Sequence, residues 1–420
     1  MKEYLLGLWE KIKKGSIKLK LLILTLLVLY IGVLFVCLYQ VEVDSSLPGT
    51  ITDVSDVISI ETENEKGKIA TVSIYSHSKM SLLQYLLVKI DKNSEVSLGK
   101  SVSLEIFTEN EEYASNVGYK QQSIQDSLIV AYNQAKNDGY DVSIDYSYKG
   151  QYLINIPQNL YKTGGEDFKN SDIIIGFNNE MFQSEEDYLN CLDNIFDIVS
   201  YDNKSVKQYK EEGRFDFYDE NGNVIQDNVN LVANILSEFK EIETELTVPF
   251  KILRNNEEKE IIPSIKMLFY LYSRVVVKET DGSASLYTIS ENNFTSYTIN
   301  YENCNPKINI SKSDTVGPSG GLMQTLAVYN AITNDDVTKG KFVTGTGGIT
   351  LDGKATIIGG EQQKVVTANL YGAQIFFVPK VNFESANEKY ITLNTQMVIV
   401  SVESFSDVIN YLKNMEVNNG

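Results

Sequence analysis

The chain has 420 residues, of which 43% are hydrophobic and 22% are charged, so it is long enough for two or three globular domains. Acidic residues outnumber Lys and Arg by 56 to 37, which gives a formal net charge of −19. Nucleic-acid binding needs a basic surface, and no basic stripe with interleaved aromatic residues occurs beyond residue 20, so we expect no nucleic-acid partner.

The first element in chain order is an uncharged run of 19 residues at positions 21–39, LLILTLLVLYIGVLFVCLY. A helix needs about 20 apolar residues to cross the hydrocarbon core of a membrane. Six lysines and two glutamates precede the run, and this excess of lysine predicts that residues 1–20 form a cytoplasmic stub. We therefore expect a single-pass protein of the cell membrane, anchored in the lipid bilayer by residues 21–39, with all later domains outside the cytoplasm.

Other interpretations of this run fit less well. It is longer than the apolar region of most signal peptides, and no small-x-small cleavage site follows in residues 40–44. Lipid attachment at Cys37 would require a small residue where Phe35-Val36 stand. Buried helices of soluble proteins seldom extend this far without a polar residue. An uncleaved membrane anchor is therefore the interpretation that we favour.

Residues 40–145 are predicted to form a connecting module. Alternation and β-branched residues predict a strand over 69–75. Amphipathic helices are predicted over 79–90 and 121–137. Apolar residues recur at helical spacing in the second of these helices: Ile124, Leu128, Ala131 and Ala135.

Short strands separated by turns are predicted between residues 142 and 182, in VSIDYSY, QYLINI and SDIIIGFNN. A helix is predicted over 185–198. Residues 201–228 are polar, acidic and rich in turn residues, which indicates a surface insertion.

A helix over 229–239 and a β-hairpin are predicted next. The hairpin strands cover 248–253 and 260–265, with Asn255-Asn256 at the turn. Asparagine is favoured there because it tolerates the positive φ angles of tight hairpin turns.

Residues 146–265 resemble a PDZ domain with an insertion at about 200–245. The similarity rests on the strand after Lys149, on SDIIIGFNNEMF, which is like the family pattern GDxIxxVNGxxV, and on the helix and hairpin that follow. The glycine-rich carboxylate-binding loop of the family is reduced to Gly150. The resemblance implies that Gly150, Gln151 and Tyr152 bind a peptide as an added strand. The alternative is a small α+β spacer without a ligand.

Gly317-Pro318-Ser319-Gly320-Gly321 precedes an apolar helix pattern in the last predicted region, 266–415, where strands and helices alternate. Proline suits a first helical turn, because its missing N–H is not needed there. Backbone amides at the helix start, including that of Gly320, would favour an oxyanion. The alternative is a serine that only caps a structural helix. One apolar face is marked along this helix by Leu322, Leu326, Tyr329 and Ile332.

Lys364 follows Ser319 by 45 positions and lies just inside another predicted helix, after a glycine-rich stretch at 341–354. A serine hydroxyl needs a neighbouring base to become a nucleophile. The chain has a single histidine, His77, far away in sequence, so lysine is the obvious base. Such a lysine must be neutral near pH 7, and burial in an apolar pocket lowers its pKa in that direction.

The stretch from about Asp314 to Pro379 resembles the proteolytic domain of the Lon (S16) serine-lysine proteases. The similarity covers DTVGPSGGLMQTLAVYNAIT and DDVTKGKFVTGTGGITLDGKATIIGGEQQKVVTANLYGAQIFFVPK. It implies that Ser319 is the nucleophile, that Lys364 is the general base and that Thr346 orients the lysine by a hydrogen bond.

This sequence departs from the family pattern in two places. Gly320 stands where alanine is usual, and Val316 where some Lon proteases have an acidic residue. The segment 348–354 fits GxxxxGK, but Ala355 replaces the Ser or Thr that would bind magnesium, so it is not a P-loop. The AAA+ ATPase of ATP-dependent Lon proteases has no counterpart here, and we expect no use of ATP.

The three cysteines are too few for a disulfide framework. Cys37 lies in the apolar run, which leaves Cys191 and Cys304 in segments assigned to different domains. No CxxC spacing is present. We therefore expect no structural zinc, no other metal and no cofactor.

The whole arrangement resembles the membrane-anchored PDZ–Lon proteases of the Gram-positive cell envelope. The predicted fold class is α+β: a transmembrane helix, a PDZ-like α+β module with an insertion and a Lon-type α/β proteolytic domain. The predicted function is an ATP-independent serine endopeptidase with a Ser-Lys dyad, which cleaves extracytoplasmic proteins or peptides and forms a homo-oligomer. The alternative is a non-catalytic envelope scaffold that binds peptides through its PDZ-like module.

Overall fold

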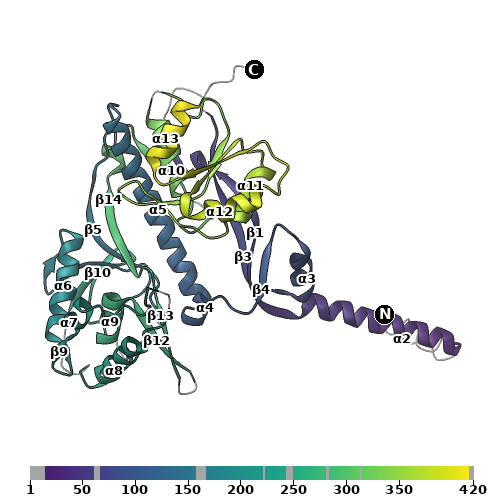
Figure 1. The fold of residues 1–420 in the computed structure, drawn as a ribbon, viewed down its shortest axis with the longest axis horizontal. Coiled ribbons are helices and arrows are strands. Elements are labelled where there is room, and N and C mark those ends of the chain that lie inside the picture. Colours follow the sequence, from purple (N-terminus) through teal and green to yellow (C-terminus); the bar gives the residue numbers. More distant parts are fainter. Residues whose placement is uncertain are drawn as a thin grey trace. The chain divides into compact units, whose positions relative to one another are not determined.

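The computed structural model describes residues 15–60, 67–157, 167–220, 223–242, 249–280, 283–312, 315–333 and 335–415. The chain divides into two compact units (Figure 1). The first consists of Met1–Gly49 and Ile74–Ser101, and the second of Thr50–Ser73 and Val102–Gly420. Most of the stub expected over 1–20 lies outside the described residues, which begin at residue 15.

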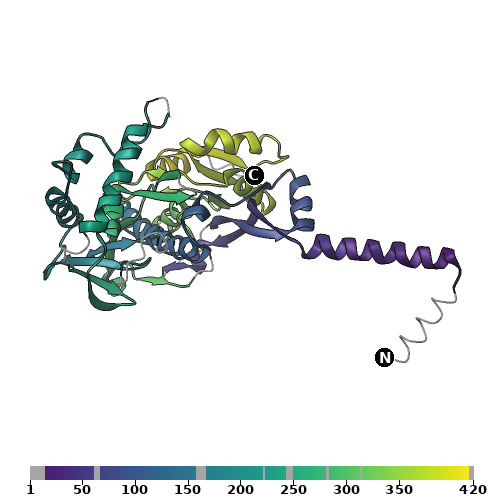
Figure 2. The same ribbon diagram turned by 90° about the horizontal axis from the view of Figure 1, so that it is seen from below.

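In the first unit the apolar run forms helix α2 (Ile17–Leu38), visible in Figure 2 as one unbroken helix. The Ser16 side chain caps it by accepting from the Leu19 amide, and none of its side chains is buried. The helix is long and apolar enough to cross a membrane. Helices of this length and composition near an N-terminus occur both as membrane spans and in signal sequences.

The rest of the first unit is a small strand and helix arrangement. Its elements are the first part of β1 (Gln40–Asp53), the last part of β3 (Ile69–Ser81), α3 (Leu82–Ile90) and β4 (Glu95–Leu98), which pairs antiparallel with β1. The helix predicted over 79–90 begins only at Leu82. Strand β3 continues to Ser81, whose side chain forms a capping box with Gln84 and so fixes the start of the helix.

A parallel sheet forms the centre of the second unit. Its strands lie in the order β3, β16 (Val343–Gly345), β19 (Ile375–Pro379) and β20 (Val398–Val402). Helices α5 (Glu109–Asn137), α10 (Gly321–Ile332) and α13 (Phe405–Asn414) supply the core on one face, and α11 (Glu361–Leu370) and α12 (Lys380–Tyr390) the core on the other.

Side chains along β19 show the two faces. Phe377 packs in the cluster with α5, α10 and α13, whereas Phe376 packs with α11 and α12. Helix α10 leads into β16, and α11 connects β16 to β19, so both helices begin at the carboxyl edge of the parallel strands. Ligands of open α/β sheets bind at this edge. The predicted apolar faces of α5 and α10 are confirmed, because Leu128 and Leu326 are fully buried.

A second, antiparallel sheet lies in the same unit. Its order is β11 (Glu257–Ile261), β10 (Phe250–Arg254), β6 (Ile173–Phe177), β5 (Tyr146–Leu153) and β14 (Asn293–Ile299), with β7 (Glu180–Met181) beside β6. Its core includes residues of α6 (Glu185–Ile198), α8 (Gln226–Ile242) and α9 (Ile265–Ser273). Figure 1 shows β5 and β14 side by side.

Several local predictions for this region are confirmed. The helix predicted over 185–198 has these bounds in α6, and Asn255 and Asn256 form the turn between β10 and β11 with φ angles of 55° and 63°. The separate strands expected in VSIDYSY and QYLINI are instead one strand, β5, because β14 pairs along its whole length.

The connecting module expected over 40–145 is divided between the two units. In the second unit β2 (Ile58–Ile60) pairs with β15 (Ile308–Ile310), and α5 packs against α10. The helix predicted from residue 121 begins at Glu109, where Thr108 and Glu111 form a capping box.

The remaining elements are short. They are η1 (Val54–Asp56), α4 (Ser103–Ile106), β8 (Ser200–Tyr201), β9 (Lys204–Ser205), α7 (Val206–Glu211), β12 (Val275–Thr280), β13 (Ser283–Thr288), η2 (Tyr301–Asn303), β17 (Gly348–Ile349) and β18 (Ala355–Thr356).

Candidate active site

Ser319 lies in a tight turn directly before α10 and is half-buried. Gly317 has a φ of 86°, which favours glycine, and the Gly321 amide donates to the Pro318 carbonyl at 3.0 Å. The helix begins at Gly321 with Gly320 as its N-cap, so Pro318 precedes the first helical turn instead of lying inside it. The sequence folds this way because the closed turn over 318–321 leaves the serine at the helix start.

The backbone amides of Ser319 and Gly320 point to a function for this turn. Within the described ranges, neither N–H has a hydrogen-bond acceptor. Both precede a helix of 12 residues, whose dipole adds positive potential at this end. Free amides at a helix N-terminus can hold the negative oxygen of a tetrahedral intermediate.

Gly320 is held in close contact with strand β3. A Cβ at this position would lie 3.0 Å from Thr71 Cγ2 and 3.4 Å from Gln324 Nε2. An alanine methyl would therefore fit only if Thr71 moved by a few tenths of an ångström. This contact gives a physical reason for glycine at position 320.

We predict that Gly320→Ala destabilises the protein by about 1 kcal/mol, because Thr71 must move out of its packed position to admit the methyl group. Thr71→Ser removes only the opposing methyl group, so the double variant should recover most of the loss. Thermal unfolding of the wild type, both single variants and the double variant measures the coupling. If the stability changes of the two single variants simply added up in the double variant, a steric contact between positions 320 and 71 would be ruled out.

The glycine-rich segment after β16 holds the serine turn from the other side. The Ser319 carbonyl accepts from the Gly347 amide at 2.9 Å and from Thr346 Oγ1 at 3.2 Å, and the Leu322 amide donates to the Gly347 carbonyl at 3.0 Å. Gly347 has a φ of 142°, and a Cβ there would lie 3.1 Å from Pro379 Cγ, so only glycine fits.

Thr346 is fully buried, and its hydroxyl has a different hydrogen-bond partner from the one expected. We predicted a hydrogen bond between its hydroxyl and Lys364, but the hydroxyl donates to the Ser319 carbonyl, and no hydrogen bond joins Thr346 to Lys364. A hydroxyl has one donor and two acceptor positions, so Thr346 Oγ1 still has lone pairs to accept from an amine.

Lys364 lies at the fourth position of α11, which starts after Gly360 with a φ of 68°. The side chain is only 3% exposed, and no described residue forms a hydrogen bond or ion pair with its Nζ. Burial lowers the pKa of Lys364 to about 8, although the negative charge of Glu361 acts in the opposite direction. A substantial share of this amine is thus neutral near physiological pH and able to accept a proton.

Ser319 and Lys364 approach the same edge of the parallel sheet from opposite faces. Ser319 precedes α10, Lys364 lies in the first part of α11, and α11 contacts β16, which leads into the Thr346 segment. The structure has no hydrogen bond between Ser319 Oγ and Lys364 Nζ. In unliganded enzymes such catalytic contacts are often long and shorten when substrate binds.

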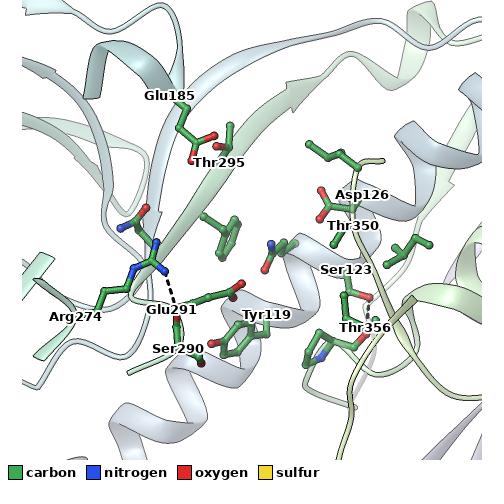
Figure 3. A pocket seen from close by; sticks show the side chains of 17 residues that line it. Tyr119, Ser123, Asp126, Glu185, Arg274, Ser290, Glu291, Thr295, Thr350 and Thr356 are labelled. Atoms are coloured by element: carbon green, nitrogen blue, oxygen red, sulfur yellow. Dashed lines mark hydrogen bonds between the residues drawn. The ribbon is translucent and has the colours of Figure 1, made fainter. Parts of the chain in front are cut away.

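A cavity of about 390 Å³ adjoins the serine turn (Figure 3). Its lining comes from α5, α6, β14 and the loop before it, from Pro318 and from the β17–β18 hairpin. Pro318 is the residue next to Ser319, and Gly348 follows Gly347, which binds the Ser319 carbonyl. The cavity thus has the position of a site for part of a bound substrate.

The residues predicted to bind a peptide, Gly150, Gln151 and Tyr152, lie in β5 and are buried. Strand β14 pairs with all three on one side, and β6 pairs with Gln151 and Tyr152 on the other. A peptide cannot add to β5 here without displacing a strand of the protein itself. The prediction that a peptide adds as a strand at these residues is therefore not met by the structure.

Two further residues, Ser123 and Gln324, position the site and are not indicated by the sequence patterns. Ser123 Oγ, on α5, donates to the Pro318 carbonyl at 3.1 Å and to Gln324 Oε1 at 3.0 Å. Gln324 is itself buried in α10. The only sequence feature that distinguishes Ser123 and Gln324 is that they are polar residues within helices predicted from apolar stripes. Among the described residues, no three His, Cys, Asp or Glu side chains are grouped as metal ligands.

Comparison with known proteins finds a family model that matches the C-terminal third of the chain. Residues 275–414 match the family model of the Lon protease (S16) C-terminal proteolytic domain. Over 96 residues, 23% of this chain, the sequence is 33% identical to the Lon protease of Malacoplasma penetrans (strain HF-2). Over 93 residues, 22% of this chain, it is 37% identical to the Lon protease of Roseiflexus castenholzii (strain DSM 13941 / HLO8).

These alignments cover 12% and 11% of the two relatives. Lon protease 1 of Myxococcus xanthus is 33% identical over 93 residues, again 11% of that protein. The chain thus matches its curated relatives over about one eighth of their length or less. What the chain shares with these relatives is their proteolytic domain.

Proposed function

We propose that this protein is a serine endopeptidase in which Ser319 is the nucleophile and Lys364 the general base. The observation that carries the proposal is the buried lysine without a partner, at the sheet edge where the serine turn is held. The match of residues 275–414 to a proteolytic domain supports it. An unpaired buried lysine is unfavourable for stability, and a function as a base accounts for it.

The proposed reaction proceeds in two stages. Neutral Lys364 accepts the Ser319 hydroxyl proton as the oxygen attacks a peptide carbonyl, and the amides of Ser319 and Gly320 bind the resulting oxyanion. The lysine then gives the proton to the leaving amine, and an acyl ester remains on Ser319. Water attacks this ester with the lysine again as base, which releases the acid and restores the serine.

We further propose that the enzyme works without ATP. The segment 348–354, which fits GxxxxGK, forms β17 and the turn into β18, whereas a P-loop joins a strand to a helix and binds phosphate at the helix start. Without coupled unfolding, the substrates would be unfolded proteins or peptides.

The proposed location is the cell membrane, with α2 as a single span, residues 1–20 in the cytoplasm and the catalytic region outside it. The length of α2 and the lysines before it support this arrangement. The proposed domains are those expected from the sequence: an anchor at 21–39, a PDZ-like module at 146–265 and a Lon-type domain at 266–415, assembled as a homo-oligomer. In the second sheet, β14 pairs with β5, which is part of the proposed module.

The test is hydrolysis of a fluorescently labelled unfolded protein by the full chain in detergent micelles. We expect release of labelled fragments at equal rates with and without ATP and magnesium. Binding of the labelled protein without any cleavage would favour a scaffold instead. Cleavage that depends on ATP would contradict the second part of the proposal.

A further inference from the structure

The cavity beside the serine turn contains a buried carboxylate that the proposed mechanism does not use. Asp126, on α5, lines the cavity and is only 5% exposed. Its Oδ1 accepts from Gln125 Nε2 at 3.2 Å, and in the described part of the chain no other group binds this carboxylate. Aspartate is seldom buried to this degree without a cation.

The protein's own cation in the cavity does not pair with Asp126. Arg274 lines the side opposite Asp126 and Ser123 in Figure 3, where its Nη1 donates to the Ser290 carbonyl at 3.0 Å. The exposed carboxylates of Glu185 and Glu291 also line the cavity. Three carboxylates and one guanidinium therefore line the cavity, and in the described part of the chain no cation forms an ion pair with the buried one, Asp126.

We propose that this cavity receives a lysine or arginine side chain of the substrate, whose positive group pairs with Asp126. The inference rests on the proposed function and adds the class of residue that the protease selects. Pro318 and Gly348 line the same cavity, so the selected side chain belongs to a residue close to the bond that Ser319 attacks. Asp126 is on this view a specificity-determining residue, and Glu185 and Glu291 attract the cation to the opening.

The charge state of Asp126 makes this preference depend on pH. Burial raises the pKa of Asp126 to about 7, the charge of Glu291 raises it further, and the Gln125 amide lowers it. The other charged or titratable groups that line the cavity are Glu185, Arg274 and Tyr119. Because the carboxyl is protonated below pH 7, the preference for a cation should weaken there and become full above pH 8.

The test uses peptides with one arginine at each position in turn, each matched to a peptide with the uncharged isostere citrulline. The ratio of kcat/KM within a pair cancels the ionisation of Lys364. For one position we expect a preference for arginine of about tenfold or more at pH 8, because hydrogen bonds to charged groups contribute about 1.5–3 kcal/mol. The ratio should approach one at pH 6.

Asp126→Asn keeps the shape and removes the charge, so its ratio should be near one at every pH. The control Asp44→Asn changes an exposed residue of the first unit and should behave as the wild type. An equal preference in Asp126→Asn, or no preference in the wild type, would overturn the inference. Asp126→Asn removes a buried charge, so its unfolding temperature at pH 8 should not fall below that of the wild type.

Failure of the proposed function gives a different result, because then no peptide is hydrolysed by the wild type. In that case a binding measurement still tests whether the cavity contains the proposed cation site. The dissociation constants of the arginine and citrulline peptides are measured with Ser319→Ala, by fluorescence anisotropy at pH 8. A ratio of about ten or more supports the site even without catalysis, and equal constants refute it.

Discussion

Ser319→Ala is expected to reduce hydrolysis of an unfolded protein by about 10⁴-fold or more, because the attacking oxygen is lost while the amides and the cavity remain. The Ser319 carbonyl, which binds Thr346 and Gly347, is unchanged by the substitution. The measurement is the initial rate of fragment release by the purified full chain.

The matched control is Ser401→Ala, an exposed serine on β20. It should retain the wild-type rate, and both variants should unfold at the wild-type temperature. If Ser319→Ala kept a rate within tenfold of the wild type, a different residue would be the nucleophile.

The second prediction with a large expected effect on the rate of hydrolysis concerns Lys364. Its folded-state pKa of about 8 lies below the ordinary value of 10.5, so the neutral base increases as the pH rises. We expect kcat/KM to rise about tenfold per unit below pH 8 and to level off above it. Lys364→Met removes the amine but keeps the length and should lower the rate by about 10⁴-fold.

Lys364→Arg should be equally inactive, because a guanidinium keeps its proton at all these pH values. Lys136→Met, at an exposed position of α5, is the control and should keep both the rate and the pH profile. A wild-type profile without the rise, or an active Lys364→Met, would contradict the assignment of the base.

The pH dependence of the unfolding free energy tests the lowered pKa of Lys364 without any substrate. A base whose pKa is lowered in the folded state destabilises the fold while the unfolded state can still be protonated. The wild type should therefore gain stability relative to Lys364→Met between about pH 8 and 10.5, by up to about 3 kcal/mol. Equal pH dependence of the two unfolding free energies would show that the lysine is not buried as described.

The sequence predicted best what is local along the chain. The α6 helix and the Asn255-Asn256 turn follow from residue types within a few positions of each other. The serine turn and the helix of Lys364 were likewise identified from short glycine-rich segments. In each case the residues that determine the backbone geometry are neighbours in sequence.

What could not be predicted depends on pairing between distant segments. Ile69 of β3 lies opposite Val343 of β16, and so a segment assigned to a connecting module became part of the sheet that carries the site. Ser123 supports Pro318, which is 195 positions later, and the same helix brings Asp126 into the cavity. No short-range pattern indicates that α5 packs against α10.

The pairing of β5 inside the antiparallel sheet also depends on distant segments. Alternation within 146–156 predicts strands but not their partners, and the partner of β5 is β14, from a region assigned to the next domain. An added peptide would compete with a strand of the same chain, whose effective concentration far exceeds that of a free peptide.

The two outer edges of this sheet are protected against pairing with unfolded chains, which are the proposed substrates. At one end, the Gln125 carboxamide donates to the Thr295 carbonyl at 3.1 Å and accepts from the Tyr297 amide at 2.8 Å, much as the peptide group of a further strand would. At the other end, β11 carries charged side chains at residues 257–260. Exposed strand edges are templates for aggregation, and capping and charge both prevent it. A protease that encounters unfolded chains is thereby protected against adding them to its own sheet.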